Sequence, residues 1–590
     1  MTEDKDTAKA LPIGVLLLGI VLLGTALRTI LMVGRGQVLE FDENFYLILA
    51  RNLFSGVGYV LDLYPDIKYS PLFPLAAGTL SLLVGDLIWA GRIVSILAGA
   101  LTCIPFYLLL KRLDRANVAL IGSLFLAVFP PMQDFVMHSA RSRDILHTGA
   151  EPPALFLMMW GVLFIVWSAK GGRKLLALGA GAAFGLAYLA RPECLLYSPM
   201  YAAAIVALAM VADRASLRHR IVCALLCIAG TAVVASPYVL YLHKHTGRWT
   251  VSGKVLIPKA RITGVDDVFD RNDWTELQED AFALSPDNKH LESTHWGVSD
   301  YHREKYAEEG GAGWGLGAAR VAANVRRCFS SVFWNLCPVY LWPFLVGGFV
   351  LAVIRCFTSR AALENEILLL VLAGPGAALA LGYRILPRYL LPVCFLVIYY
   401  SAAAAVWLAR RAAEYGDVAQ RAPAGALAIV MGVHALWPAI YANEAAQGWL
   451  AFAAERGLAA EVISQHTEKD LTIMSFHPQA VFRSGRRWRT MPLAEAKRVF
   501  EYACNTKADA LIFGQDQPPE YDYPFHRQER FRWVLFDMRP LLQAGVPLDK
   551  GIFQPEKRIT NRTPKGDVRF MLIVKAIPAS SALQAPKPER

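Results

Sequence analysis

The sequence predicts a largely α-helical protein that crosses a membrane many times. Of its 590 residues, 55% are hydrophobic and only 18% are charged, whereas soluble domains carry about 25% charged residues. The apolar residues are gathered in blocks of about twenty, the length that a helix needs to cross the hydrocarbon core of a bilayer. Composition and block length together exclude a disordered chain and argue against an entirely soluble enzyme.

Eleven apolar blocks fit transmembrane helices in length and composition. They lie at about residues 11–33, 89–110, 116–131, 152–169, 174–190, 193–212, 219–242, 337–355, 366–383, 389–409 and 424–441. A twelfth apolar stretch, residues 71–84, is only fourteen residues long and begins with Pro71 and Pro74. That length suits a surface segment better than a span, so we expect it to lie at the outer surface of the membrane.

The charges of the loops predict the orientation of the chain. If the N-terminus lies inside, every loop on the inner side is basic, as the positive-inside rule requires. The basic residues on the inner side are then Lys5, Lys9, Lys111, Arg112, Arg115, Lys170, Arg173, Lys174, Arg214, Arg218, Arg220, Arg355, Arg360, Arg410, Arg411 and Arg421. The net charge of +11 therefore reflects loops that face an anionic lipid surface, and no nucleic-acid partner is expected.

This orientation leaves three segments on the outer side. Two of them, residues 34–87 and 243–336, are outer loops of a transmembrane domain that we expect to cover residues 1–441. The third, residues 442–590, is expected to form a small α/β domain, because it alternates strand-like runs with a helical stretch at 493–503. The strand-like runs lie at 471–476, 510–513, 532–537 and 568–574.

Charged residues of both signs gather at the outer ends of the predicted spans. Any one of them can be explained as an interface residue that extends its charge to water. Acidic and basic groups from six separate segments at one face instead favour a polar site. The residues are Arg28, Asp42, Glu43, Arg51, Lys68, Arg92, Asp134, Arg141, Arg143, Asp144, Glu151, Arg191, Glu193, Arg384 and Arg388.

Residues 41–53 are predicted to form an amphipathic helix on the membrane surface. The apolar residues that share one of its faces are Phe41, Phe45, Ile48, Leu49 and Leu53. Asp42 and Glu43 open this helix, where negative charge is favoured, so that they can serve simply to cap it. Alternatively, one carboxylate faces a reactant as a base while the other pairs with a cation, since adjacent helix positions point about 100° apart.

Several motifs in this region resemble the first outer loop of the GT-C glycosyltransferases. They are Asp42-Glu43, Tyr46, Ala50-Arg51-Asn52-Leu53, Gly56-x-Gly58-Tyr59 and Ser70-Pro71-Leu72-Phe73-Pro74. The branch that they fit contains the protein O-mannosyltransferases, the lipid A aminoarabinose transferases and the core galacturonosyltransferases of lipopolysaccharide. Two later motifs agree with it. They are Ala190-Arg191-Pro192-Glu193, similar to a turn between two spans, and Arg388-Tyr389-Leu390-Leu391-Pro392, similar to the start of a late span.

The resemblance implies a GT-C fold of about 11 transmembrane helices, with surface helices in the first outer loop and a small periplasmic domain at the C-terminal end. It implies an enzyme of the bacterial inner membrane that transfers a single sugar, with inversion, from a polyprenyl-phosphate donor to an acceptor hydroxyl on the periplasmic side. The expected partners are this donor and a lipid or protein acceptor. No metal site is predicted, and a divalent cation as cofactor is left open.

The resemblance also implies roles for particular residues. Asp42 is the base that takes the proton of the acceptor hydroxyl, Glu43 positions it or pairs with an arginine, and Glu151 is a second acidic residue of the site. The donor phosphate is bound by Arg388, whose guanidinium matches phosphate geometry, and also by Lys68 and Arg92. Lys68 and Arg388 also fit simple interface anchors. The residues expected to support the site are Tyr46, Asp144, Arg191, Glu193 and Arg384.

Two other functions stay open at this stage. An oligosaccharide ligase shares the fold and the type of donor, and it differs only in the size of the glycan that it moves. A lipid or sugar transporter would carry its binding residues near the membrane midplane and would show internal repeats. The charged residues here lie at one face instead, and the sequence shows no repeat of fixed period.

Overall fold

The structure, a computed structural model, describes most of the chain. The described residues are 12–34, 41–113, 116–133, 149–171, 173–212, 216–255, 282–292, 297–308, a few between 322 and 326, 336–382, 387–413, 417–440, most of 460–515, 547–548, 551–562 and 568–578. The chain divides into two compact units. Unit 1 holds residues 1–36, 70–238 and 315–443, and unit 2 holds residues 37–69, 239–314 and 444–590. The predicted domain boundary at residue 441 stays a prediction.

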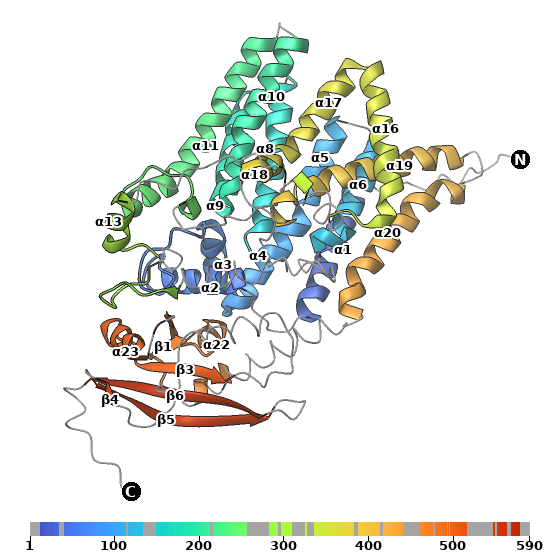
Figure 1. The fold of residues 1–590 in the computed structure, drawn as a ribbon. Helices are drawn as coiled ribbons and strands as arrows, with labels where there is room; N and C mark the ends of the chain where they lie inside the picture. Colours follow the sequence, from blue (N-terminus) through green and yellow to red (C-terminus); the bar gives the residue numbers. More distant parts are fainter. Residues whose placement is uncertain are drawn as a thin grey trace, which may run out of the picture. The chain divides into compact units, whose positions relative to one another are not determined.

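Unit 1 is a bundle of helices (Figure 1). Its helices are α1 (Ile13–Gly34), α3 (Leu72–Val84), α4 (Leu87–Leu101), α5 (Cys103–Leu113), α6 (Ala116–Val128), α7 (Pro130–Gln133), α8 (Glu151–Ala169), α9 (Leu175–Ala190), α10 (Tyr197–Ala212), the first part of α11 (Leu217–Thr246), α16 (Trp342–Thr358), α17 (Arg360–Leu370), α18 (Gly374–Gly382), α19 (Val393–Ala412) and α20 (Asp417–Ile440). Short 3-10 helices include η1 (Pro192–Leu196) and η8 (Pro387–Leu390).

The expectation of a polytopic helical membrane protein is confirmed. Each of the eleven predicted spans contains a helix, and within the described residues eight helices are long and apolar enough to cross a membrane. Three of the eleven have shorter apolar helices, at Ala116–Val128, Leu175–Ala190 and Ala422–His434. The twelfth stretch is a 13-residue helix, Leu72–Val84. The number of spans therefore stays a prediction.

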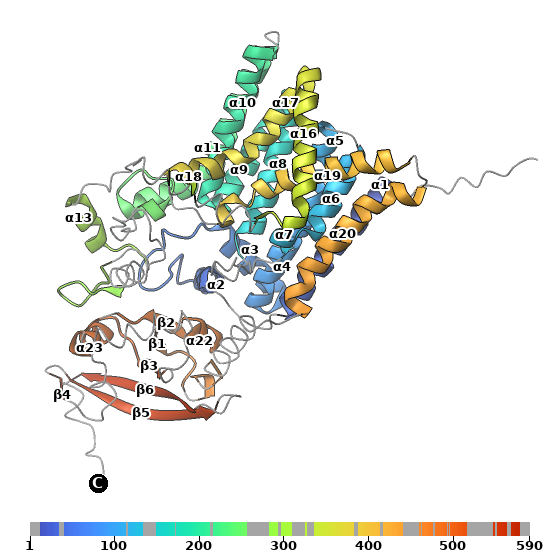
Figure 2. The same ribbon diagram turned by 45° about the vertical axis from the view of Figure 1, so that its right-hand side comes forward.

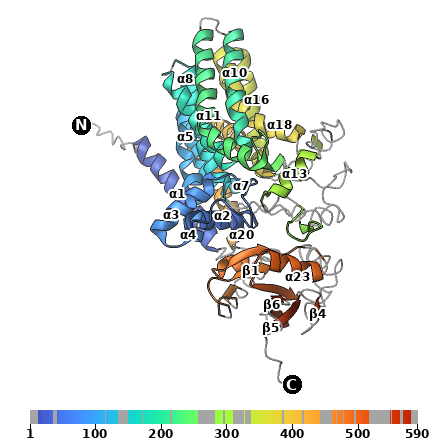
Figure 3. The same cartoon turned by 90° about the vertical axis from the view of Figure 1, so that its left-hand side faces the viewer.

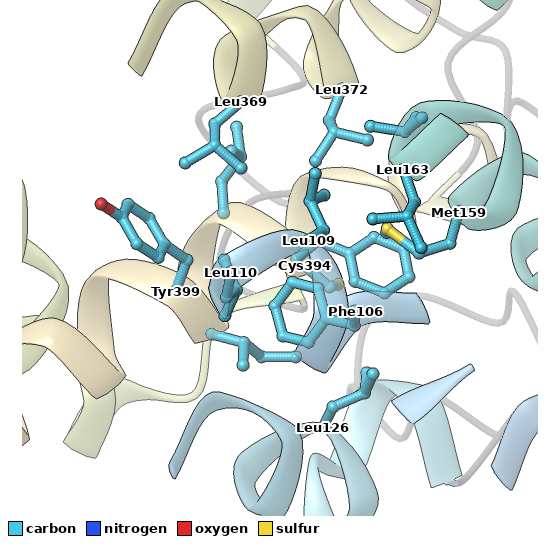
Figure 4. Packing of buried hydrophobic residues seen from close by; sticks show 14 of the residues in the cluster. Phe106, Leu109, Leu110, Leu126, Met159, Leu163, Leu369, Leu372, Cys394 and Tyr399 are labelled. Atoms are coloured by element: carbon cyan, nitrogen blue, oxygen red, sulfur yellow. The ribbon is translucent and has the colours of Figure 1, made fainter. Parts of the chain in front are cut away.

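The core of unit 1 is built where α5, α6, α8 and α19 meet. Phe106 and Leu109 of α5 pack with Met159 and Leu163 of α8 and with Cys394 of α19 (Figure 4). All five side chains are buried. These helices are apolar on more than one face, as expected of segments that contact both lipid and other helices.

Small residues allow α9 and α11 to cross at very short range. A Cβ atom on Gly181 of α9 would lie 2.0 Å from the carbonyl oxygen of Cys227 in α11. A Cβ atom on Gly230 of α11 would in turn lie 2.5 Å from the carbonyl oxygen of Leu178 in α9. Because the two glycines face the opposite backbones, the helices come closer than any pair with larger side chains could.

Four of the predicted inner loops come together at one end of unit 1. Arg112 at the end of α5 donates a hydrogen bond to the carbonyl of Lys170, which follows α8, over 3.0 Å. Asn365 of α17 donates to the carbonyl of Leu113 over 2.6 Å, and Arg360 donates to the carbonyl of Val211 near the end of α10. The ends of α10 and α11 lie side by side at the top of Figure 3. Segments predicted to share one side of the membrane therefore lie at the same end of the bundle.

In the part of the C-terminal region that the structure describes, six strands form one sheet in the order β2-β1-β3-β6-β5-β4. Strand β1 is parallel to β2 and to β3, and the remaining neighbours are antiparallel. The strands are β1 (Thr472–Ser475), β2 (Arg487–Thr490), β3 (Ala510–Gln515), β4 (Pro547–Leu548), β5 (Gly551–Arg562) and β6 (Val568–Pro578). Helices α22 (Pro478–Arg483) and α23 (Ala496–Asn505) connect the parallel strands. Figure 2 shows β5 and β6 as a long hairpin beside them.

Most of the local structure predicted for this region is present. Three of the strand-like runs are strands β1, β3 and β6, the helical stretch is α23, and the run at 532–537 lies outside the described residues. Strand β2 was not predicted, because its sequence alternates Arg487 and Arg489 with Trp488 and Thr490 and looks like a basic loop. Its pattern is that of an edge strand, with Trp488 and Thr490 buried on one face.

Within unit 2, the C-terminal region packs on the predicted first outer loop. The guanidinium of Arg51, in α2 (Phe41–Phe54), lies 4.7 Å above the ring of Phe482 in α22 and donates to the carbonyl of Arg486 over 3.1 Å. Arg489 of β2 forms an ion pair with Asp62 at 2.9 Å, and the side chain of Asp62 is only 2% exposed. Segments more than 400 residues apart in sequence thus build one compact unit.

Candidate active site

Helix α2 places Asp42 and Glu43 in its first turn, as predicted. The sequence did not predict how far the central part of this helix is buried. Every residue from Glu43 to Ala50 is buried, so no exposed face remains there. The cause lies in unit 2 itself, because Trp488 of β2 packs 6.1 Å from the ring of Phe45, and Phe482 covers Arg51.

The carboxylate of Asp42 is held by a tyrosine. Its Oδ1 atom accepts a hydrogen bond from the hydroxyl of Tyr69 at 3.0 Å. Tyr69 is only 2% exposed, and burial, with the charge of Asp42 beside it, raises the pKa of Tyr69 well above its usual range. The phenol therefore keeps its proton and acts as the donor. The ring of Tyr46 meets that of Tyr69 edge-on at 4.9 Å, which fixes the tyrosine from the side of α2.

Lys68 joins the same group of side chains. Its ammonium lies 4.8 Å from the ring centre of Tyr69 and 5.9 Å from that of Phe45, so it sits over aromatic faces in the range of cation–π interactions. Unit 2 thus brings together three residues that the sequence predicted for the site, Asp42, Tyr46 and Lys68. Tyr69 connects them, and the sequence analysis did not single it out.

Asp66 is a second residue that the sequence analysis missed. It is 1% exposed, and its Oδ2 atom accepts the backbone N–H of Tyr69 at 2.8 Å. Its Oδ1 atom is buried and has no hydrogen-bond partner among the described residues. Burial raises the pKa of Asp66 to about 7, although the N–H of Tyr69 and the charge of Lys68 act in the opposite direction. The only signal in the sequence was its place two residues before Lys68.

Unit 1 contributes a buried ion-pair network. Arg191 lies 2.5 Å from Glu151 and 2.6 Å from Glu193, with its side chain 5% exposed. Its guanidinium also lies 5.8 Å from the ring centre of Tyr389 in η8. Two motifs that lie far apart in the sequence, at Arg191 and at Tyr389, are therefore in contact, together with the predicted residues Glu151 and Glu193.

The local sequence explains the positions of Arg191, Glu193 and Glu151. Arg191 ends α9 in an extended conformation, with φ −142° and ψ 120°, the conformation favoured for a residue that precedes proline. Pro192 then begins η1, which carries Glu193 back toward the arginine. Glu151 is the first residue of α8, where two prolines follow it and where a negative charge is favoured.

Arg92 lies on α4, close to the chain before Glu151. It is 2% exposed, and its guanidinium is 5.4 Å from the ring centre of Trp89. Ser95, three residues later and hence on the same helix face, donates to the carbonyl of Gly149 over 3.2 Å. The α4 face that carries Arg92 therefore borders the start of α8.

The remaining predicted residues are only partly placed. Arg388 belongs to η8 beside Tyr389, but its side chain lies outside the described residues, as do Asp144 and Arg384 entirely. In the described parts of the chain, no group of three or more His, Cys, Asp or Glu side chains could hold a metal ion. The candidate residues that the structure describes therefore form two separate groups, one in each unit.

Comparisons with known proteins find a family model that matches part of the chain and solved proteins with a similar fold. Residues 68–241 match the family model of the dolichyl-phosphate-mannose-protein mannosyltransferases. The matched segment includes Lys68, Arg92, Glu151 and Arg191. A comparison with curated protein sequences finds no match.

Two solved proteins have a similar fold at low sequence identity. ArnT from Cupriavidus metallidurans bound to undecaprenyl phosphate gives a TM-score of 0.51 at 12% identity, over 97% of this chain and 99% of that chain. AglB, an archaeal oligosaccharyltransferase from Archaeoglobus fulgidus in complex with an inhibitory peptide and a dolichol-phosphate, gives 0.51 at 11% identity, over 97% of this chain and 75% of that chain. An oligosaccharyltransferase from Archaeoglobus fulgidus in complex with Zn and sulfate gives a TM-score of 0.53 at 13% identity, over 97% of this chain and 76% of that chain. The match over residues 68–241 and the shared fold make the chain similar to the GT-C membrane glycosyltransferases.

Proposed function

We propose that the protein transfers a single sugar, with inversion, from a polyprenyl-phosphate donor to an acceptor hydroxyl on the periplasmic side of the bacterial inner membrane. The observation that carries this proposal is the Asp42 carboxylate, held at 3.0 Å by the hydroxyl of Tyr69 with the Lys68 ammonium over the same ring. A fixed carboxylate and a nearby cation are the two groups that this chemistry needs. The undecaprenyl phosphate bound to ArnT and the dolichol-phosphate bound to AglB support the choice of donor.

The reaction that we propose for Asp42 is general-base catalysis. The acceptor oxygen forms a bond with the anomeric carbon of the sugar and gives its proton to the Asp42 carboxylate. The bond between that carbon and the phosphate oxygen breaks, and its electron pair leaves with the lipid phosphate. Attack from the face opposite the phosphate inverts the configuration. Tyr69 keeps the carboxylate in place, so that less free energy is needed to orient it when the acceptor arrives.

The cations stabilise the departing phosphate. We assign this role to Lys68 and Arg388, because a positive charge placed before the reaction stabilises negative charge that develops on the leaving group. Arg92 stays a third candidate. Arg191 is already balanced by Glu151 and Glu193, so we assign it and its two carboxylates to positioning. Through its contact with Tyr389, this network fixes the η8 segment that carries Arg388.

The test is sugar transfer by the purified protein in lipid nanodiscs, with undecaprenyl-phosphate sugars as donors. Asp42→Asn preserves size and hydrogen bonding but removes the base, and it is expected to lower transfer at least about 100-fold, the lower range for general-base catalysis. Asp86→Asn is the matched control, because Asp86 is an exposed aspartate that caps α4 through the N–H of Trp89. Transfer by Asp42→Asn at the control's rate would contradict the assignment of the base.

The size of the product separates this proposal from an oligosaccharide ligase. The fold does not decide between them, since ArnT and the oligosaccharyltransferase give nearly equal TM-scores of 0.51 and 0.53. Mass spectrometry of envelope lipids and glycoproteins, with and without the gene, would show a difference of one sugar for the proposed enzyme. A difference of several sugars would favour the ligase, and passage of lipid across sealed vesicles without any transfer would favour a transporter.

A further inference from the structure

A cluster of cations lies at the end of unit 1 where the predicted inner loops meet. It comprises Arg112 of α5, Lys170 after α8 and Arg220 of α11, together with Glu364 and Asn365 of α17. Arg112 donates to the carbonyl of Lys170 over 3.0 Å, and the Lys170 ammonium donates to the Oδ1 atom of Asn365. The third cation, Arg220, pairs with Glu364 over 3.0 Å. Four separate helices thus bring three positive charges and one negative charge to one place.

The charges in this cluster are close enough to affect one another. Burial lowers the pKa of Lys170 below its usual range, the charges of Arg112 and Arg220 act in the same direction, and Glu364 opposes them. Like charges that approach one another in a partly buried position repel strongly. Among the residues that the structure describes here, Glu364 is the carboxylate that offsets them, which leaves an excess of positive charge.

Two hydrogen-bond donors of Arg220 have no partner among the described residues. The residue is 5% exposed, and its Nε and Nη1 atoms are buried without a hydrogen-bond partner among the described residues. Leaving buried donors of a charged group unmatched costs free energy, so a site of this kind is more stable when an anion is bound. A guanidinium presents several N–H groups in one plane and suits phosphate oxygens in particular.

We propose that Arg112, Lys170 and Arg220 form a binding site for a phosphate group, supplied by the headgroup of an acidic lipid. The lipid source follows from position, because the cluster lies at the ends of predicted spans, where basic groups between helices meet headgroups on the inner side. Arg112 is exposed and Lys170 is half-buried, so both are within reach of such a headgroup. This site is independent of sugar transfer, which we place at the residues around Asp42.

Native mass spectrometry of the full-length protein tests the proposal with cardiolipin, phosphatidylglycerol, phosphatidylcholine and inorganic phosphate as separate probes. The double variant Arg112→Gln/Lys170→Gln is expected to bind the two acidic lipids roughly 30-fold more weakly, from about fivefold for each cation near an acidic surface. The matched control is Arg173→Gln/Arg218→Gln, which removes two exposed cations from the same loops. It is expected to stay within about twofold of the unchanged protein.

The outcomes separate the sources of the phosphate group. A loss confined to Arg112→Gln/Lys170→Gln, with acidic lipids preferred over phosphatidylcholine, supports a lipid site. Tight binding of inorganic phosphate without a preference for acidic lipids supports a phosphate site and assigns it to a soluble anion. An equal loss in both double variants, or no preference for any phosphate probe over phosphatidylcholine, would overturn the proposal and leave the cluster as a clamp between helices. Melting temperatures of both variants in detergent show whether a loss of binding reflects unfolding.

Discussion

At the scale of single residues, the sequence identified Asp42 and Lys68, while the structure added the residue that connects them. Asp42 stands in a motif that resembles a known family, and Lys68 lies two residues before another. Their chemistry suits a base and a phosphate ligand. Tyr69 lies in the same motif region but carries no charge, so nothing in its type signalled its hydrogen bond to a residue 27 positions earlier. Contacts of this kind depend on how the loop folds back, and residue types alone do not predict them.

The hydrogen bond between Tyr69 and Asp42 is expected to matter for catalysis. Tyr69→Phe keeps the ring but removes the hydroxyl, and we expect transfer to fall about tenfold or more, because hydrogen bonds to charged groups contribute about 1.5–3 kcal/mol. Tyr301→Phe is the control, since Tyr301 donates to the carboxylate of Glu292 at 2.7 Å in the same unit. Initial rates at saturating donor measure the difference. Equal activity of the two variants would show that Tyr69 does not position the base.

Asp66 predicts a dependence of stability on pH. Its pKa is about 7 in the folded protein and close to 3.8 in an unfolded chain, so between these values the folded state holds a proton that the unfolded state has lost. Stability contributed by this group therefore falls as the pH rises from about 4 to 7 and stays low above 7. Asp66→Asn keeps an acceptor for the N–H of Tyr69 and removes the titration.

The pH prediction is checked by thermal melting at pH 5, 6, 7 and 8. Relative to the unchanged protein, Asp66→Asn is expected to gain stability steadily up to pH 7 and to gain little more at pH 8. Asp86→Asn, in which an exposed aspartate is replaced, controls for the loss of one charge. A difference between Asp66→Asn and the unchanged protein that is the same at every pH would show that Asp66 does not titrate in this range.

At the scale of helices and strands, apolar block length predicted unit 1 well and unit 2 less well. A helix that contacts lipid must be apolar along about twenty residues, and this requirement is visible in the sequence. The burial of helix α2 by partners from the C-terminal region was not visible in the sequence. Strand β2 was not recognised in the sequence, because its arginines alternate with the buried residues Trp488 and Thr490. Both features have the same cause, which is that segments distant in the sequence determine the burial.

The crossing of α9 and α11 gives a prediction about packing. Gly181→Ala places a methyl group 2.0 Å from the carbonyl oxygen of Cys227, which forces the helices apart and is expected to cost about 1–3 kcal/mol, as overpacking does. Gly179→Ala is the matched control in the same helix, because its methyl group would meet the ring of Phe164 at 3.6 Å, an ordinary contact. Thermal melting in detergent compares the two. A Gly181→Ala variant that melts with Gly179→Ala would contradict the close crossing.

At the scale of the whole molecule, the loop charges predict a topology that can be tested directly. Basic residues from four predicted inner loops meet at one end of unit 1, as a common side of the membrane requires. A periplasmic reporter fused after residue 84 should be active, and one fused after Lys111 should be inactive, because α4 and α5 together span 27 residues. The reverse pattern, inactive after residue 84 and active after Lys111, would mean that Leu72–Val84 crosses the membrane. Reporters on the same side would mean that Leu87–Leu113 does not cross it.

The burial of α2 also has a consequence for the order in which the chain is assembled. Its Arg51 contacts the carbonyl of Arg486, a residue 435 positions later. At a synthesis rate of roughly 5–20 residues per second, that partner appears about 20 to 90 seconds after the helix itself. During this interval the segment with Asp42 lacks its partners from the C-terminal region, so it is expected to be among the last parts of the protein to become buried. A ribosome-bound chain that ends before residue 482 should therefore expose α2 to protease, and one that extends past β2 should protect it.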